Sequence, residues 1–245
     1  MMCKIRIRRI RFLAFLVFCV LFVSRSAWAT SSGLNNIPTT DTTSENILVF
    51  QTWGNFAGGE HPGQFAGFKY GLFRDVEIGI DSKVNDKPHG HAMFQAKYAF
   101  DIVDEEWRGV IGVADLSDNR KDNGEYFPYV ATSVDLTALR LHFGFAPQPH
   151  NERFFAGADK TVTFLNRNLQ LRGDVIHIND KKDALFSLGF LYELNARSGD
   201  EKAQSGLAEF WNEITKSIIL ESWVSKPSTG DKETYTMKVN YLIRF

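Results

Sequence analysis

Six histidines are the side chains best suited to acid–base or metal chemistry: His61, His89, His91, His142, His150 and His177. Hydrolysis through a nucleophile requires a hydroxyl or thiol within hydrogen-bond reach of a histidine base. Ser133 and Asp135 lie on one predicted strand and His142 on the next, which makes the only Ser/His/Asp grouping that we can assemble. A histidine that merely hydrogen-bonds inside the molecule explains these residues as well, so we predict no catalytic residue.

Two further stretches carry ligand-type side chains but do not make a metal site. His89-Gly90-His91 offers two imidazoles without a nearby third ligand, and such pairs are usually solvated. The acidic run from Asp118 to Glu125 places Arg120 at a ligand position and Asn123 where a calcium loop needs its glycine. We therefore expect no metal and no cofactor.

Charge and cysteine are unevenly distributed over the 245 residues. Up to position 29 the chain has six basic residues and no acid, which leaves 22 basic and 29 acidic residues in the remainder. Both cysteines, Cys3 and Cys19, also lie in this first stretch. Disulfides, zinc-cysteine sites and cysteine nucleophiles are thus excluded beyond it, and a net charge near −7 without a basic run argues against nucleic acid as a partner.

Residues 1–29 have the three parts of a secretory signal peptide. Lys4 to Arg11 is basic, Phe12 to Val23 is apolar, and Ala27-Trp28-Ala29 supplies a cleavage pattern. The twelve apolar residues are too few for a membrane-spanning helix, which needs about 20. A signal anchor is the alternative, but export with cleavage after Ala29 is the expectation.

Alternation of apolar and polar residues predicts β-strands over most of the remaining chain. The clearest run is the C-terminus, where Tyr235, Met237, Val239, Tyr241, Ile243 and Phe245 alternate with mostly polar residues. Strands 107–116 and 213–225 have apolar residues on both faces, and 168–178 requires a bulge near Gly173. The twelve candidate strands are 47–53, 64–72, 76–84, 91–101, 107–116, 126–135, 138–146, 153–162, 168–178, 184–194, 213–225 and 233–245.

The connections between these strands alternate in length. Short connections at 73–75, 102–106, 136–137 and 163–167 alternate with longer polar ones, as in barrels that cross the outer membrane. The segment 195–212 is the exception, because it is the longest connection and lies on the short side. Its Leu207, Phe210 and Trp211, with Ile214 just after it, have helical spacing, so it is either a short amphipathic helix or a loop that leads into an earlier-starting strand.

The last strand resembles the terminal signature of bacterial outer-membrane β-barrel proteins. Phe245, Ile243, Tyr241 and Val239, with Met237, match the alternate apolar positions of that signature. The resemblance implies recognition by the outer-membrane barrel assembly machinery, contact with outer-membrane lipid, and a location in the bacterial outer membrane after export through the periplasm. It names a class and no subfamily.

The fold expected from pattern and resemblance is all-β: a closed antiparallel transmembrane barrel of about 12 strands, within a range of 10 to 14. The domain organisation is a signal peptide at 1–29, a flexible periplasmic lead-in at 30–46, and the barrel at 47–245. The lead-in is expected to be flexible because eight of its seventeen residues are Ser or Thr. A soluble secreted β-sandwich is the rival architecture.

A lumen of intermediate width follows from twelve strands, and its charges are the candidate selectivity residues. If the cations line an open path, they favour anionic solutes; if they form cross-lumen ion pairs, the barrel conducts little. The candidates that we expect to face inward are Lys69, Lys97, Arg140, Arg172, Lys238, Glu77 and Asp81.

Three functions fit the sequence. The first is a narrow channel for small polar or anionic solutes. The second is a non-conducting structural or interaction barrel that binds a surface polymer or a partner through its external loops. The third is an outer-membrane lipid-modifying enzyme, which would use His142.

Overall fold

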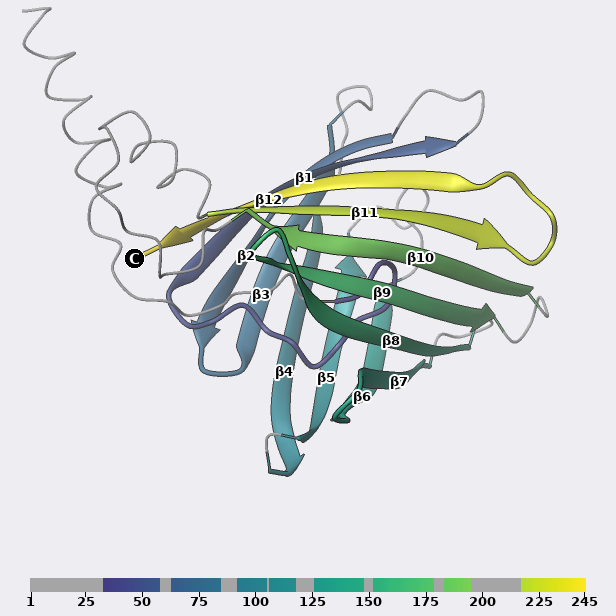
Figure 1. Cartoon of the computed structure of the whole chain (residues 1–245). Coiled ribbons are helices and arrows are strands. Elements are labelled where there is room, and N and C mark those ends of the chain that lie inside the picture. Colours follow the sequence, from purple (N-terminus) through teal and green to yellow (C-terminus); the bar gives the residue numbers. More distant parts are fainter. Residues whose placement is uncertain are drawn as a thin grey trace, which may run out of the picture.

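The computed structural model describes residues 33–57, 63–84, 92–104, 106–117, 126–147, 152–178, 183–194 and 217–245. Their strands form one closed ring (Figure 1). The predicted signal peptide, the His89-Gly90-His91 stretch, the run 118–125 and the connection 195–212 lie outside the described residues.

The ring contains twelve antiparallel strands, as predicted. Each strand pairs with its neighbours in sequence, and β1 closes the ring against β12 through eleven residue pairs from Ile47↔Arg244 to Ala57↔Thr234. The strands are β1 (Ile47–Ala57), β2 (Gly63–Phe73), β3 (Val76–Lys83), β4 (Met93–Val103), β5 (Trp107–Leu116), β6 (Phe127–Asp135), β7 (Arg140–Ala146), β8 (Arg153–Phe164), β9 (Arg167–Ile178), β10 (Asp183–Glu193), β11 (Ile218–Pro227) and β12 (Thr234–Arg244).

Tight turns gather at one end of the barrel, which we call the turn end. It holds the connections β2–β3, β4–β5, β6–β7 and β8–β9; the opposite end is called the loop end. Leu165 and Asn166 join β8 to β9 with φ of 50° and 59°. Positive φ at both central residues matches the right-handed twist of paired strands, which explains how two residues suffice there.

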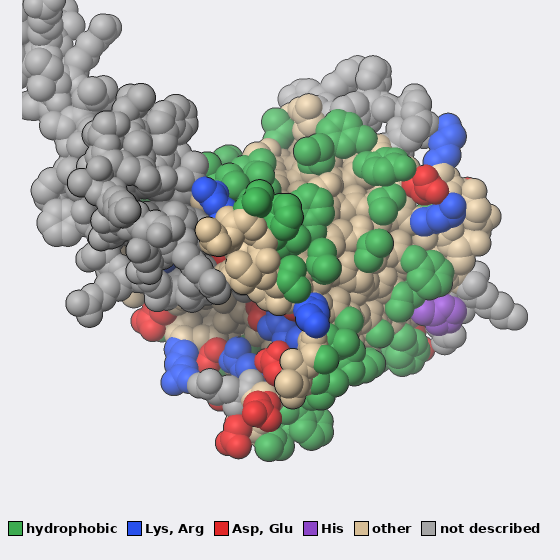
Figure 2. Space-filling view, viewed as in Figure 1, with side chains coloured by type: hydrophobic (Ala, Val, Ile, Leu, Met, Phe, Trp, Pro, Cys, Tyr) green, Lys and Arg blue, Asp and Glu red, His purple; other side chains and the backbone are tan. Residues whose placement is uncertain are grey.

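Apolar side chains cover the outer surface of the strands. Figure 2 shows hydrophobic groups spread over the visible wall. Among the described residues there is no helix long and apolar enough to cross a membrane. The large apolar residues exposed on the strands include Phe68, Ile78, Phe94, Tyr98, Ile111, Val130, Phe143, Phe154, Leu171, Phe186, Leu188, Tyr235, Met237 and Val239.

The bulge expected near Gly173 is wrong. β9 keeps an unbroken register with both β8 and β10 through Gly173. The sequence suggested a change of phase because Ile176 is apolar although it shares its face with Arg172 and Asp174. In the structure all three are buried inside the barrel, and Ile176 belongs to an internal apolar cluster.

That cluster forms around the chain segment that precedes β1. Residues 33–45 run inside the ring of strands (Figure 1), where Leu34 and Ile37 are buried. The wall supplies apolar side chains that face inward to meet them, which also explains why strand 107–116 is apolar on both faces. The wall members of the cluster are Ala99, Val110, Phe127, Tyr129, Ala146, Phe155 and Ile176.

Residues 33–45 of the lead-in expected at 30–46 thus lie inside the barrel, and we call them the N-terminal segment. Thr39, Thr40 and Thr43 are almost completely buried. The Ser/Thr-rich composition cannot build a core of its own, but here the barrel wall provides the hydrogen-bond partners that the threonines require.

Candidate functional site

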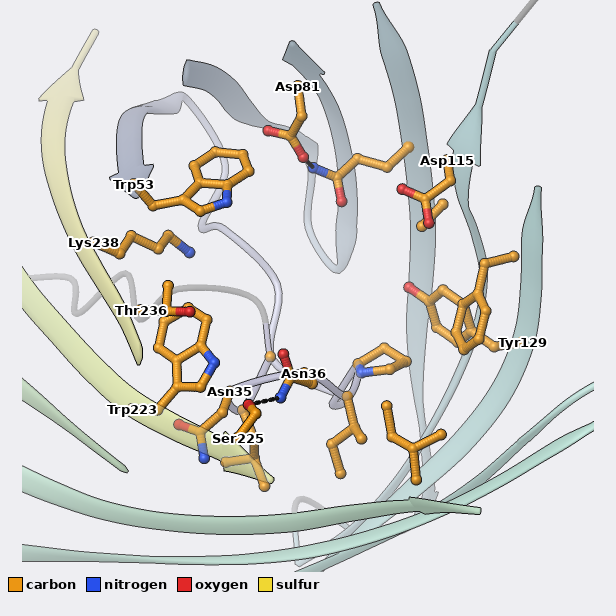
Figure 3. A pocket seen from close by; sticks show the side chains of 18 of the residues that line it. Asn35, Asn36, Trp53, Asp81, Asp115, Tyr129, Trp223, Ser225, Thr236 and Lys238 are labelled. Atoms are coloured by element: carbon orange, nitrogen blue, oxygen red, sulfur yellow. Dashed lines mark hydrogen bonds between the residues drawn. The ribbon is translucent and has the colours of Figure 1, made fainter. Parts of the chain in front are cut away.

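A cavity of about 490 Å³ lies in the lumen beside the N-terminal segment. Figure 3 shows Trp53, Lys238, Thr236 and Trp223 along one wall, with Asp81, Asp115 and Tyr129 opposite. The cavity is within the size range of pockets that hold small ligands, and it combines aromatic walls with a few charged groups.

The seven predicted lumen residues divide into two groups. Lys69, Lys97, Lys238, Glu77 and Asp81 line the cavity, whereas Arg140 and Arg172 lie in ion pairs outside its lining. The orientation expected for all seven is thus observed, because the alternation of the strands sets it. Their closest acidic partners, Asp41 and Asp159 for Arg140 and Glu221 for Arg172, are residues that the sequence did not single out.

Arg140 on β7 binds Asp41 of the N-terminal segment. Its Nη1 and Nη2 donate to the two carboxylate oxygens of Asp41 at 2.6 and 2.8 Å. Its Nε donates to Asp159 on β8 at 3.0 Å. Two parallel hydrogen bonds between charged groups make the strongest kind of side-chain pair, so this contact fixes the segment to the wall.

The Asp41 carboxyl is ionised in this setting. Its burial favours the neutral form, but the charge and hydrogen bonds of Arg140, aided by Lys97, outweigh that effect and lower the pKa of Asp41 to about 2. The contact with Arg140 is therefore a full ion pair at neutral pH. We call the pair of Asp41 and Arg140 the clasp.

Two more charged residues bind the segment next to the clasp. Lys97 on β4 donates from Nζ to the backbone oxygens of Asp41 and Thr39, the latter at 3.3 Å. Glu77 on β3 accepts from the backbone N and the hydroxyl of Thr43 at 2.7 and 2.8 Å. Both residues also line the cavity, so cavity and segment share part of their wall.

Glu221 on β11 is the centre of a second charged group. Arg172 donates to it at 2.8 Å, Asn240 donates at 2.5 Å, and the Lys238 Nζ lies 3.4 Å away. Gln170 connects the two groups, because its amide donates to Asp159 at 2.7 Å and its oxygen accepts from Arg172. One polar network therefore extends from the clasp to the cavity wall.

The Ser/His/Asp grouping forms with a different acid from the one expected. Ser133 Oγ lies 2.7 Å from His142 Nδ1, and His142 Nε2 lies 2.7 Å from Asp159, not from Asp135. His142 is 0% exposed, and Thr40 of the segment covers Ser133 with a 3.4 Å contact from its backbone N. In this arrangement the N-terminal segment covers Ser133, and His142 orients the Asp159 carboxylate that binds Arg140.

Metal-ligating side chains do not gather in the described part of the chain: no group of three His, Cys, Asp or Glu residues there is placed to hold an ion. The two stretches weighed from sequence for metal binding, His89 to His91 and Asp118 to Glu125, lie outside that part.

Buried side chains occupy the lumen at the turn end. Ile47 and Val49 of β1 pack with Leu242 of β12, and Asn240 is 0% exposed. Thr39, Thr40 and Thr43 of the segment are buried in the same part of the barrel. The cavity lining reaches the loop end of its strands at Asn55, Asp115 and Thr234.

Comparison with known proteins places the fold. No family model matches the sequence, and no curated protein matches it. Among solved structures, the KdgM porin is 12% identical with a TM-score of 0.54 over 79% of this chain and 98% of its own. The KdgM porin in complex with disordered oligogalacturonate is 12% identical, with a TM-score of 0.53 over 79% of this chain and 98% of its own. The NanC porin is also 12% identical, with a TM-score of 0.53 over 78% of this chain and 98% of its own. The chain therefore has the β-barrel fold of the bacterial outer-membrane porins.

Proposed function

We propose that the protein is an outer-membrane channel for small anionic solutes. The observation that carries this proposal is the lumenal cavity inside a closed barrel with an apolar outer face. Its lining has four cations against three acids: Lys69, Lys97, Arg153 and Lys238, with Glu77, Asp81 and Asp115. Cations on the wall of a narrow, low-dielectric path raise the local concentration of anions. The long connections would face the exterior, and the short turns would face the periplasm.

The chemistry of the cavity supports an acidic organic solute with a ring. Trp53 and Trp223 project into the space on either side of Lys238 and Thr236 (Figure 3). Aromatic faces contact the apolar faces of a ring, and the ammonium and hydroxyl groups bind its oxygens. The KdgM porin has been solved in complex with disordered oligogalacturonate.

Planar-bilayer recording tests the channel. The purified barrel is expected to carry current with a reversal potential that indicates anion preference in a salt gradient. Lys69→Glu combined with Lys238→Glu should weaken or reverse that preference, because both side chains line the cavity. Lys226→Glu, at an exposed position near the loop end, is the matched control and should change it little. If the folded double variant kept the anion preference of the unchanged barrel, that result would contradict the proposal.

Membrane assembly gives a second test, because the apolar terminal strand is proposed to be the assembly signal. Deletion of Phe245 should lower the amount of barrel in the outer-membrane fraction several-fold. Phe245→Trp, which keeps an aromatic end, should assemble normally. The heat-dependent shift in gel mobility reports the folded fraction, and normal levels after the deletion would exclude this role.

The N-terminal segment is the observation that favours the second candidate, a non-conducting interaction barrel. Thr39, Thr40 and Thr43 of the segment and the side chains around Ile47 are buried in the lumen at the turn end. Passage of a solute thus requires the segment to move. A barrel that carries no current in any state of the segment would support this second candidate.

A further inference from the structure

We propose that residues 33–45 are a gate, held shut by the clasp between Asp41 and Arg140, and that the cations which hold it line the path once it opens. This inference rests on the proposed channel function and concerns its regulation. Four features of the structure carry it: the closure of the ring, the contacts of the segment, its hinge, and the space beside it.

The barrel closes without the segment. β1 and β12 pair directly along eleven residues, and the twelve strands form a complete ring in which residues 33–44 take no position. Removal of the segment from the lumen therefore breaks no strand pairing. A segment that is not part of the sheet can leave while the sheet stays intact.

Side chains of the wall make the contacts that hold the segment. Toward β1, Arg140 and Lys97 bind Asp41, and Glu77 binds Thr43. Near the start of the segment, Asn36 donates from Nδ2 to Ser187 at 2.5 Å and to Ser225 at 2.8 Å. Such contacts are discrete, so they break and form as a set when the segment moves.

A hinge joins the segment to the sheet. Asn46 has a φ of 60°, the left-handed conformation, and it lies directly before β1. Glu45 forms an isolated bridge with Gly71, and the Asn46 N donates to the Gly71 O at 3.0 Å. A Cβ at Gly71 would overlap the backbone carbonyls of Ser44 and Thr43, so only glycine lets the chain pass here.

The segment has wall on one side and free space on the other. Leu34 and Ile37 pack toward the apolar wall at Gly157, where an added Cβ would lie 2.6 and 2.8 Å from their terminal carbons. Gly33 to Pro38 at the same time line the cavity of about 490 Å³. A permanent plug would be packed on all sides, whereas this segment has room to shift.

Opening changes the charge of the path. In the closed state Arg140 is neutralised by Asp41 and Asp159, and Lys97 is bound to backbone oxygens of the segment. When the segment leaves, Asp41 leaves with it, and both cations stay on the wall. The open path is therefore more positive than the closed cavity, which favours anions.

Cross-linking tests the gate directly, because the chain has no cysteine after Cys19. Asn36→Cys combined with Ser225→Cys places two thiols at a contact that is present only in the closed state. A short bifunctional methanethiosulfonate reagent should bridge them and lower the bilayer conductance at least tenfold, and reduction should restore it. Each single cysteine variant, treated with the same reagent, is the control and should keep its conductance.

Removal of residues 33–44 tests the open state of the gate. Asp41→Asn is the milder variant if the deletion variant assembles poorly. Either change should give a larger and more continuous current with stronger anion preference. Equal conductance before and after cross-linking would overturn the gate while leaving the channel in place. A folded deletion variant without current would overturn the channel function itself, so the two failures are distinguishable.

Discussion

Arg140→Ala is expected to lower the free energy of unfolding by about 3 kcal/mol, the lower end of the loss when one partner of a buried ion pair is removed, because both side chains of the clasp are 18% exposed. Arg140 is the cation that contacts both Asp41 and Asp159. Without it, two carboxylates face each other in the lumen, and Asp159 keeps only its contacts with His142 and Gln170 among those described above. Urea unfolding in detergent or lipid, followed by gel mobility, measures the loss.

Asp41→Asn is the matched comparison, because it removes the same ion pair from the segment side and keeps the contact of Arg140 with Asp159. It should cost less stability and should open the gate. In the double variant the two losses should not add, since they remove one shared interaction. Additive losses would mean that Arg140 acts through Asp159 alone and that the clasp does not hold the segment.

The fold was predictable because every strand of a membrane barrel has the same alternation of apolar and polar residues. Side chains alternate with period two, and an apolar outer face with a polar lumen makes that alternation visible along the chain. The run from Tyr235 to Phe245 shows it without interruption, and β12 occupies nearly the same residues. The positions of the lumenal charges follow from the same alternation.

The N-terminal segment could not be predicted from its composition. A low content of large apolar residues shows that a segment cannot bury itself alone, but it does not show whether an existing polar lumen can receive it. The signal was in the wall instead. Val110, Phe127 and Ile176 are apolar on the face that a water-filled lumen would keep polar, and each is buried in the cluster around Leu34 and Ile37.

The partners of the predicted cations were missed for a related reason. Alternation tells which face a residue occupies, but the partner across the lumen depends on register and on the segment, neither of which the sequence specifies. Glu221 lay in a predicted strand with apolar residues on both faces, so its orientation was ambiguous. Asp41 lay in a stretch that was expected to be outside the barrel.

Glu221→Gln is expected to affect both stability and selectivity. Glu221 is 3% exposed and is the anionic partner of both Arg172 and Lys238. Glutamine keeps the shape and the hydrogen-bonding capacity but removes the charge. Two buried cations then remain close to each other without a carboxylate between them, so the free energy of unfolding should fall by about 3 kcal/mol.

The same substitution should raise the anion preference, because Lys238 lines the cavity and loses the charge that offsets its own. Glu233→Gln is the matched control: it removes the acid of an exposed pair with Lys226 and should change neither property measurably. Unfolding and reversal potential, measured on the same preparations, separate the two effects. Lower stability with unchanged selectivity would place Lys238 outside the conducting path, because a charge on that path cannot lose its partner without changing the field that a passing anion meets.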